Sequence, residues 1–244
     1  MHGIIAVYLR EMLILKRRFK RQLAGMAVSP LLYLIAFGYA MGDAVQVNGH
    51  SYLEFLIPGL VAMTSMTQSF GIATDINVAR FYWYIFEEFQ AAPISNFAYV
   101  SGEVLAGMTR GLLGIIVILL LALPFGVVVK CTLLFWLAAI LNSFVFASLA
   151  VALAMLVKSH ADQSLLNSFV ITPMAFLGGT FFPVERLPIW AQKILFLLPL
   201  THASKAIRSV ALGNTPDLWA YVILPFTGIV FFLLALGSVN HARD

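Results

Sequence analysis

Long apolar stretches separated by short polar ones dominate the chain. A helix needs about 20 apolar residues to cross the ~30 Å hydrocarbon core of a bilayer. No internal repeat or linker divides the stretches, so they predict one all-α integral membrane domain over residues 1–244. We expect six transmembrane helices, at residues 24–41, 52–75, 102–123, 133–157, 165–181 and 218–239.

The first residues, 2–24, mix apolar and basic positions. The apolar residues recur at spacings of three and four, which places most of them on one face of a helix. Such a pattern is typical of an amphipathic helix in the membrane interface whose basic side chains reach the headgroups. The alternative is a basic tail without structure. If the helix forms, its interface anchors are Arg10, Lys16, Arg17, Arg18 and Arg21.

The connections between the spans differ in character. Residues 42–51 predict a short loop, and residues 76–100 a longer and more polar segment. Prolines interrupt residues 182–217, and the apolar pieces 189–198 and 203–212 are each too short to cross a bilayer. We therefore predict two short interfacial or re-entrant helices before the last span.

The composition indicates that much of the chain is surrounded by lipid and not by water. Hydrophobic residues make up 61% of the chain and charged residues 11%, with a mean hydropathy of +0.93. A soluble domain carries about a quarter charged residues. Even a well-folded soluble domain leaves much of its chain exposed, so this composition excludes an ordinary soluble protein.

The net charge of +4 does not indicate a nucleic-acid partner, because six of the fifteen basic residues lie together between Arg10 and Arg21. A basic cluster beside an apolar span sets topology and binds anionic headgroups. With a cytoplasmic N-terminus, nine basic residues fall inside and five outside, which predicts N-in and C-in. The nine are Arg10, Lys16, Arg17, Arg18, Lys20, Arg21, Arg80, Lys158 and Arg243; the five are Lys130, Arg186, Lys193, Lys205 and Arg208.

Ionisable residues in or beside spans are candidates for a transport pathway, because burying them in a membrane is costly. Arg110 is the deepest and could line a path for an anionic substrate. Alternatively, backbone carbonyls or a carboxylate from another span satisfy it. Glu54 and Thr172 are further pathway candidates. Glu54 and Asp75 lie at opposite ends of their span, so both could instead be interfacial.

Motifs for catalysis are missing from the sequence. Cys131 is the only cysteine, which excludes a disulfide within the chain and a Cys-based metal site. His160 and His202 have no second ligand at helical spacing, and no G-x-x-x-x-G-K-[ST] phosphate loop occurs. We expect no enzyme activity and no catalytic, metal or cofactor-binding residue in this chain.

A series of short motifs carries a resemblance to a known family. They are YLEFLIPG at 52–59, YIFEEFQAAPISN at 84–96, Arg110–Gly111, Thr172–Pro173 followed by FLGGTFFP at 176–183, and LLPLTH at 197–202 with Ile207–Arg208 downstream. In this order the chain resembles the permease subunit of ABC transporters of the ABC-2 export type. It is most similar to the branch with rhizobial nodulation-factor exporters and daunorubicin-type drug exporters. Phe89 departs from the leucine common at that position.

The resemblance implies roles for three segments. Residues 2–24 would be the interface helix, and residues 184–212 the two extracytoplasmic re-entrant helices. Residues 81–96 would be the coupling loop or helix that docks on a separate ATP-binding subunit. The implied coupling contacts are Phe86, Glu87, Glu88, Phe89 and Pro93.

The resemblance also implies an assembly. Two copies of this permease would form the pathway as a homodimer in the bacterial plasma (inner) membrane. Two copies of a separate subunit would bind ATP and Mg²⁺, and no nucleic acid would take part. Many aromatic residues in the spans suit an amphipathic cargo, such as a lipid-linked glycan, a lipo-oligosaccharide or a hydrophobic drug.

Two other classes of function stay open at this point. An autonomous channel or secondary transporter would show inverted repeats and ionisable clusters at the membrane midplane. A membrane enzyme acting on lipids would show His, Asp or Glu clustered at one membrane face. The sequence shows neither pattern convincingly.

Overall fold

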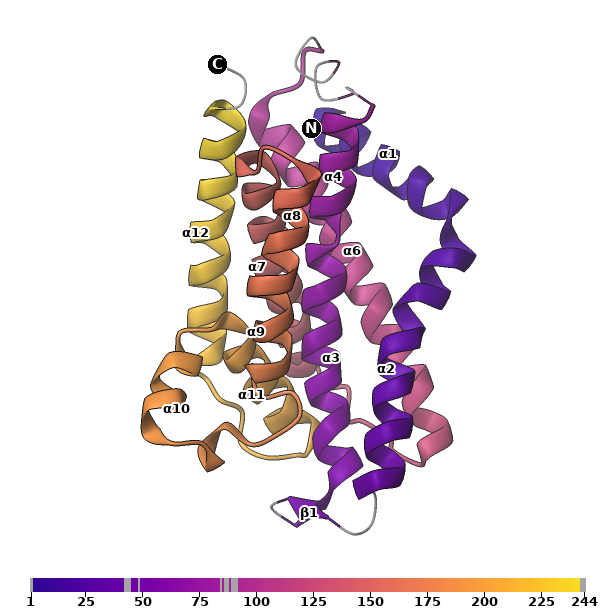
Figure 1. Cartoon of the computed structure of the whole chain (residues 1–244), viewed down its shortest axis with the longest axis vertical. Helices are drawn as coiled ribbons and strands as arrows, with labels where there is room; N and C mark the ends of the chain where they lie inside the picture. The colour runs from indigo at the N-terminus through magenta and orange to yellow at the C-terminus, as the bar shows by residue number, and fades with distance from the viewer. Residues whose placement is uncertain are drawn as a thin grey trace.

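The described part of the protein is a bundle of long helices that run along one axis (Figure 1). The computed structural model describes residues 2–41, 45–47, 49–83, 85, 88 and 92–241. The helices are α1 His2–Arg17, α2 Phe19–Met41, α3 Tyr52–Phe70, α4 Ile72–Phe81, α6 Asn96–Ala122, α7 Leu133–Leu156, α8 His160–Leu166, α9 Thr172–Leu177, α10 Ile189–Phe196, α11 Pro199–Ala211 and α12 Ala220–His241.

Four stretches of the described chain are helical, long and apolar enough to cross a membrane: Tyr52–Phe81, Asn96–Phe125, Leu133–Leu156 and Ala220–His241. They confirm a helical membrane protein with several spans. The other two predicted spans, 24–41 and 165–181, correspond to α2 and to the broken helix that contains α8 and α9. Six crossings therefore stay a prediction. Both ends of the described chain lie at the same end of the bundle, as an even number of crossings requires (Figure 1).

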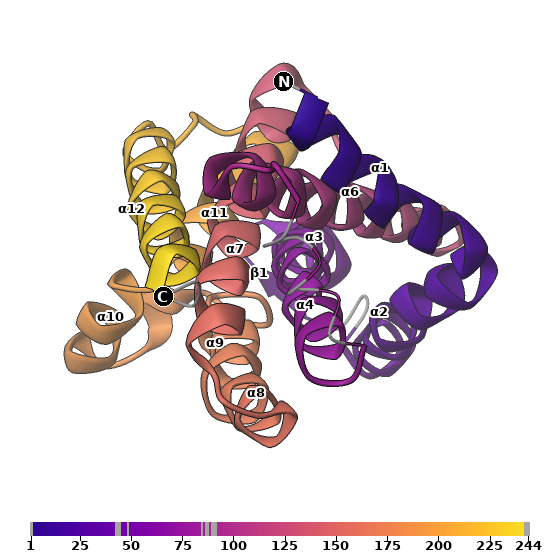
Figure 2. The ribbon, with the colours of Figure 1, turned by 90° about the horizontal axis from the view of Figure 1, so that it is seen from above.

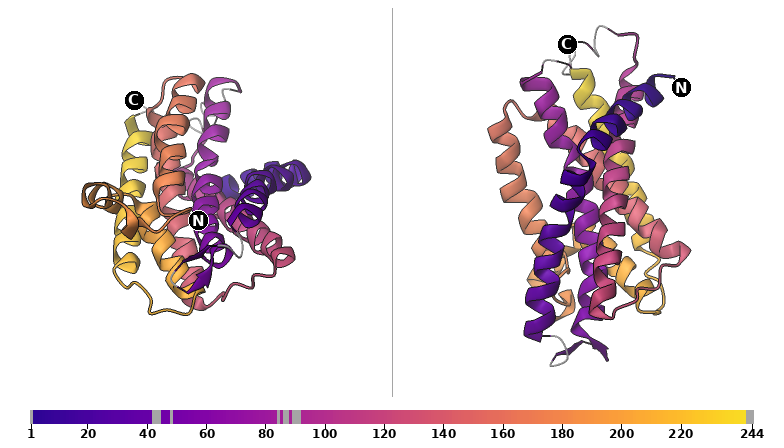
Figure 3. Two further views of the ribbon diagram at one scale, coloured as in Figure 1. Left: turned by 60° about the horizontal axis from the view of Figure 1, so that its bottom comes forward. Right: turned by 90° about the vertical axis from the view of Figure 1, so that its right-hand side faces the viewer.

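The first two helices form one bent path down the side of the bundle (Figure 3, right). The helix is interrupted between α1 and α2 at Arg18, so the predicted interface segment 2–24 contains α1 and the first residues of α2, and its place in the interface stays a prediction. One face of α1 packs against α6 and buries Val7, Glu11 and Leu15, which are four residues apart. Its other side exposes Ile5, Leu9 and Leu13.

The helix α3 lies toward the middle of the bundle, with α12 on one side and α1 and α2 on the other (Figure 2). It packs against α6, α7 and α11. Small residues allow these helices to approach closely, which is how helices associate when lipid offers no hydrophobic driving force. A Cβ atom at Gly111 of α6 would meet Ser69 Oγ, would lie 2.7 Å from Ser143 Oγ, and would lie 3.0 Å from the Ser65 carbonyl oxygen.

Two predicted connections contain more regular structure than expected. The loop 42–51 includes an antiparallel hairpin of β1 Gln46–Val47 and β2 His50–Ser51, whose turn uses Gly49 at φ +82°. The all-α prediction missed it because strands of two residues leave no periodic signal.

The polar segment 76–100 is also partly helical, because α4 continues to Phe81 and α6 begins at Asn96. Two of its polar side chains bond to other helices: Asn77 donates to Gln163 Oε1 at 2.9 Å, and Arg80 donates to the Ala154 carbonyl. Hydropathy alone ended this span too early.

A π-helical turn, Asn167–Ile171, separates α8 from α9. The amide of Thr172 donates to the Asn167 carbonyl five residues back, immediately before Pro173. Proline has no amide hydrogen and its ring clashes with the preceding turn, so the helix widens there.

The short helices α10 and α11 confirm that the 182–217 region contains no spanning helix. They lie in the half of the bundle away from the termini (Figure 1). The helix α11 begins at Pro199, four residues before the predicted 203, and is buried against α3 and α7. In contrast, α10 exposes most of its apolar side chains.

Substitution Gly111→Ala tests the close packing of α6. The added methyl group forces Ser69 and Ser143 to move, so we expect a loss of about 1–3 kcal/mol in the free energy of unfolding. Gly237→Ala on α12 is the matched control, because nothing lies within 4 Å of its added Cβ. Thermal unfolding of the purified protein in detergent compares them; equal midpoints for both variants would contradict the packing.

Candidate functional site

A cluster of five charged residues joins three helices near the end of the bundle that carries the termini. Arg10 and Glu11 come from α1, Asp75 from α4, and Glu103 and Arg110 from α6. Arg110 donates to Asp75 Oδ2 and, at 3.4 Å, to Glu11 Oε2. Arg10 Nη1 lies 2.9 Å from Glu11 Oε1 and 4.0 Å from Glu103 Oε1.

Helical spacing explains why these residues meet. Glu103 and Arg110 are seven residues apart and share one face of α6. Glu11 follows Val7 by one helical turn on the face of α1 that packs against α6. Gly102 permits the approach, because a Cβ atom there would lie 2.6 Å from Val7 Cβ. A hydrogen bond between Tyr8 Oη and Thr109 Oγ1 at 3.1 Å extends the same contact.

Three members of the cluster are deeply buried: Glu11, Glu103 and Arg110 are each at most 4% exposed, whereas the side chains of Arg10 and Asp75 are 24% and 35% exposed. Burial raises the pKa of Glu11 above its usual carboxyl value, while Arg10 and Arg110 act in the opposite direction. The charged form of Glu11 therefore depends on its two arginines. Removing one partner from such a buried pair costs about 3–5 kcal/mol, because a charge is then left uncompensated.

The predicted pathway residues occupy separate places. Arg110 contacts carboxylates from other helices, which agrees with the structural alternative considered for it. Glu54 closes a capping box at the start of α3, where its Oε2 accepts the Ser51 amide at 2.9 Å and lies 3.6 Å from His50 Nδ1. Thr172 is exposed at the start of α9. No described contact joins these three residues, so a shared pathway stays a prediction.

Sequence reasoning missed Glu11 as a member of the site. A signal was present: Glu11 is the only acidic residue among positions 2–24 and lies one turn from Val7 and from Leu15. An acidic group on the buried face of a basic helix indicates a buried cationic partner.

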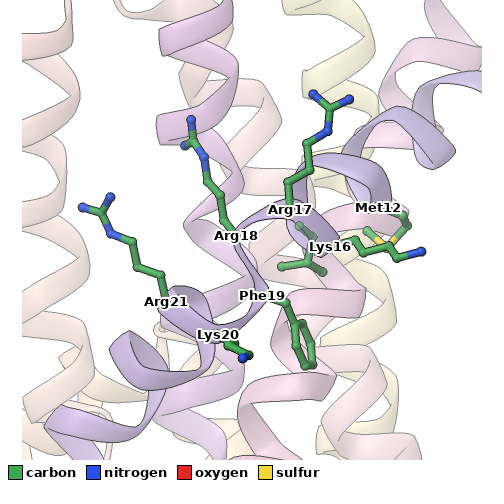
Figure 4. A pocket seen from close by; sticks show the side chains of 8 residues that line it. Met12, Lys16, Arg17, Arg18, Phe19, Lys20 and Arg21 are labelled. Carbon is green, nitrogen blue, oxygen red and sulfur yellow. The ribbon is translucent and has the colours of Figure 1, made fainter.

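The basic residues at the junction of α1 and α2 form a second feature of this end. A cavity of about 770 Å³ lies there, lined by Met12, Leu15 and residues 16–21. Arg17, Arg18 and Arg21 extend in the same general direction, while Phe19 points another way (Figure 4). No ion pair among the described residues involves Lys16, Arg17, Arg18 or Arg21, whose charges are exposed. Arg10 differs from these anchors because it belongs to the buried cluster.

The predicted coupling segment lies mostly outside the described residues, which include neither Phe86, Glu87 nor Phe89. Glu88 is exposed, and its carbonyl accepts the Ala92 amide at 3.0 Å. Pro93 is exposed in the turn before α6, whose first turn is capped by Ser95 Oγ. In the sequence, this segment follows α4 and precedes α6, the two helices that carry Asp75 and Arg110.

The described residues include no group of three or more His, Cys, Asp or Glu side chains that could hold a metal ion. His202 Nε2 donates to the Phe196 carbonyl at 2.7 Å, and His160 packs edge-on against Tyr82. Each of these histidines has a partner that accounts for its position.

These features define a multi-pass helical membrane protein with a buried charge cluster and no catalytic constellation among the described residues. Comparison with known sequences gives the family: residues 2–212 match the ABC-2 type transporter family, to which the chain belongs. The match covers α1 through α11 together with the charge cluster.

Individual relatives agree with the family. The chain is 30% identical to the inner membrane transport permease YadH of Escherichia coli (strain K12), over 98% of this chain and 94% of the relative. It is 32% identical to Nodulation protein J of Rhizobium meliloti (strain 1021), over 91% of this chain and 89% of that protein. The resemblance noted from the motifs is confirmed, and the chain is a transport permease of the inner membrane.

A double-mutant cycle on Arg110 and Glu11 tests the cluster. Arg110→Gln removes the arginine that contacts the buried Glu11 and the partly exposed Asp75, so we expect a loss of about 3–5 kcal/mol in the free energy of unfolding. Because the residues interact, the combined variant with Glu11→Gln should lose less than the sum of the single losses, by about 0.5–3 kcal/mol. Thermal unfolding in detergent measures all three variants.

The control for this cycle is Arg18→Gln, at an exposed arginine outside the described ion pairs. It should change the stability by no more than about 0.5 kcal/mol. Strict additivity of the Arg110 and Glu11 losses would show that the two side chains do not interact.

Proposed function

We propose that this chain is the permease subunit of an ATP-driven exporter, in which two copies form the membrane pathway and each couples to a separate ATP-binding subunit. The observation that carries the proposal is the family match over residues 2–212, across nearly the whole helical bundle. The missing phosphate loop supports the same assignment, since the sequence lacks the usual cradle for nucleotide phosphates.

Coupling would pass through residues 81–96. This segment leaves α4 and enters α6, so a push from an ATP-binding subunit would act on both helices at once. The charge cluster ties α4 and α6 to α1 through Asp75, Arg110 and Glu11. The interface helix would then follow the two span helices as one body.

ATP binding can shift the permease only as far as its affinity differs between the two permease conformations. That leverage requires a contact surface which changes little while the bundle behind it moves. Buried charge pairs suit this task, because separating them is expensive. We infer that the cluster makes the inner half of α1, α4 and α6 the stiff part of the subunit.

The topology that fits this function has six crossings with both ends in the cytoplasm. The helix α2 and the helix from α8 to α9 would supply the two crossings beyond the four long apolar stretches. The short helices α10 and α11 would then lie on the outer side as the re-entrant pair. The bundle's aromatic residues suit an amphipathic cargo.

Charge reversal of the coupling segment tests the proposal. The protein, purified from its native membrane, should bring down an ATPase of about 25–35 kDa, a common domain size. In the variant Glu87→Lys/Glu88→Lys, repulsion between like charges would replace attraction at the contact with the ATP-binding subunit. This change would weaken the binding free energy by several kcal/mol. We expect at least about tenfold less bound ATPase and a matching loss of stimulated ATP hydrolysis.

The matched control is Lys193→Glu, a charge reversal at an exposed position of α10 in the opposite half of the bundle. It should bind the ATPase as the wild type does. If no ATPase is found reproducibly in the wild-type preparation, the proposal is contradicted. Unchanged ATPase binding and stimulation in the double reversal would remove residues 81–96 from the coupling role.

A further inference from the structure

A second cavity lies in the half of the bundle away from the termini, between α10, α11 and the start of α12. Its volume is about 630 Å³, within the ~300–1,000 Å³ usual for ligand pockets. No residue of the charge cluster lines it, and neither do the predicted pathway residues. The side chains that matter here are Thr201, Lys205, Arg208, Glu185, Asp217 and Trp219.

Arg208 lines the cavity, and two of its three nitrogens donate to backbone carbonyls. Its Nε donates to the Phe55 carbonyl at 3.1 Å, and its Nη2 donates to the carbonyls of Gly179 and Thr180 at 2.7 and 3.3 Å. The guanidinium lies 3.8 Å from the centre of the Phe55 ring. Nη1 makes none of the described hydrogen bonds, and no described ion pair includes Arg208. A guanidinium fixed in this way is suited to bind a phosphate or carboxylate oxygen.

Thr201 adds an unsatisfied donor to the same lining. The residue is 9% exposed, and its Oγ1 is buried without a hydrogen-bond partner. An unsatisfied buried hydroxyl destabilises the protein, and a ligand that accepts its hydrogen bond would recover that loss.

Charges of both signs face the cavity but pair loosely. Lys205 Nζ lies 4.0 Å from Asp217 Oδ2, and the lysine side chain is 60% exposed. Glu185 is also exposed, and no described ion pair includes it. Two cations and two carboxylates therefore line one cavity without close pairing among them. This charge pattern complements a ligand that carries both a negative and a positive group.

The rim of the cavity is apolar. The helix α10 exposes Ile189, Trp190, Ile194 and Phe196, and Trp219 is exposed beside the start of α12. In an inner membrane protein such side chains face acyl chains, and exposed tryptophans mark the level of the headgroups. The cavity therefore lies beside apolar side chains of the kind that contact lipid.

We propose that the cavity between α10, α11 and α12 binds the headgroup of a phospholipid that carries a primary ammonium group. Arg208, Lys205 and Thr201 donate to the phosphate oxygens, and Asp217 and Glu185 accept from the ammonium. The acyl chains lie on the exposed apolar face of α10. This binding needs no ATP-binding subunit, so its test is independent of the proposed transport function.

Native mass spectrometry of the delipidated full-length protein in detergent tests the site, by titration with phosphatidylethanolamine and phosphatidylcholine of the same acyl chains. The two lipids differ only in methylation of the ammonium, which removes its hydrogen-bond donors. Since a hydrogen bond to a charged group contributes about 1.5–3 kcal/mol, we expect phosphatidylethanolamine to bind roughly tenfold more tightly. Equal binding of the two lipids would overturn the proposal.

Variants assign the binding to this cavity. Thr201→Val and Lys205→Gln should each weaken phosphatidylethanolamine binding by roughly three- to tenfold. Both should fold, because Thr201 Oγ1 makes no hydrogen bond and Lys205 is exposed. Asp217→Asn should reduce the preference of the protein for phosphatidylethanolamine over phosphatidylcholine. The matched controls are Thr227→Val on α12, whose hydroxyl bonds within its own helix, and Lys193→Gln on α10; both should bind like the wild type.

Other occupants give different results. Free phosphoethanolamine binding as tightly as the lipid would assign the cavity to a soluble molecule and overturn the membrane-lipid assignment. A second copy of the chain covering this face would exclude the lipid. In that case Thr201→Val and Lys205→Gln would leave lipid binding unchanged, which also contradicts the proposal.

Discussion

Arg110 is the side chain on which the half of the bundle with the termini depends, because a guanidinium buried in a membrane protein needs its partners within the fold. It finds Asp75 on α4 and Glu11 on α1, so one residue of α6 fixes two further helices. The close approach of α1 to Gly102 and the hydrogen bond between Tyr8 and Thr109 hold α1 against α6 in the same relative position. Lipid-facing positions tolerate more variation, because they need only be apolar.

The two halves of the bundle provide different partners for their buried charged side chains. At the end with the termini, charges pair with one another and tie helices together. In the other half, Arg208 is satisfied by backbone carbonyls from the turn after α9 and from α3, and one of its nitrogens makes no described hydrogen bond. The first arrangement suits the transmission of force. The second leaves one nitrogen of a cavity-lining arginine without a described hydrogen bond.

Hydropathy predicted most of the helices, since apolar length is what a bilayer demands. It ended the second span at Asp75 because residues 76–81 include Asn77 and Arg80, whose partners on other helices cannot be read from a local window. It missed the 46–51 hairpin, whose strands are too short for a period, and it left Glu11 unassigned. The motif order indicated the family correctly, whereas the coupling roles of Phe86, Glu87, Glu88, Phe89 and Pro93 stay predictions.

The account stands on α1 and α6 moving as one body, and a disulfide between them tests this most directly. Cβ atoms at Gly3 and Ala98 would lie 3.1 Å apart, near the ~3.5–4.5 Å of disulfides. In a Cys131→Ser background, Gly3→Cys/Ala98→Cys should cross-link in membranes and keep the ATP hydrolysis of the proposed complex with the ATP-binding subunit. Failure to cross-link, or a cross-link that abolishes this stimulation and is reversed by reductant, would contradict the account.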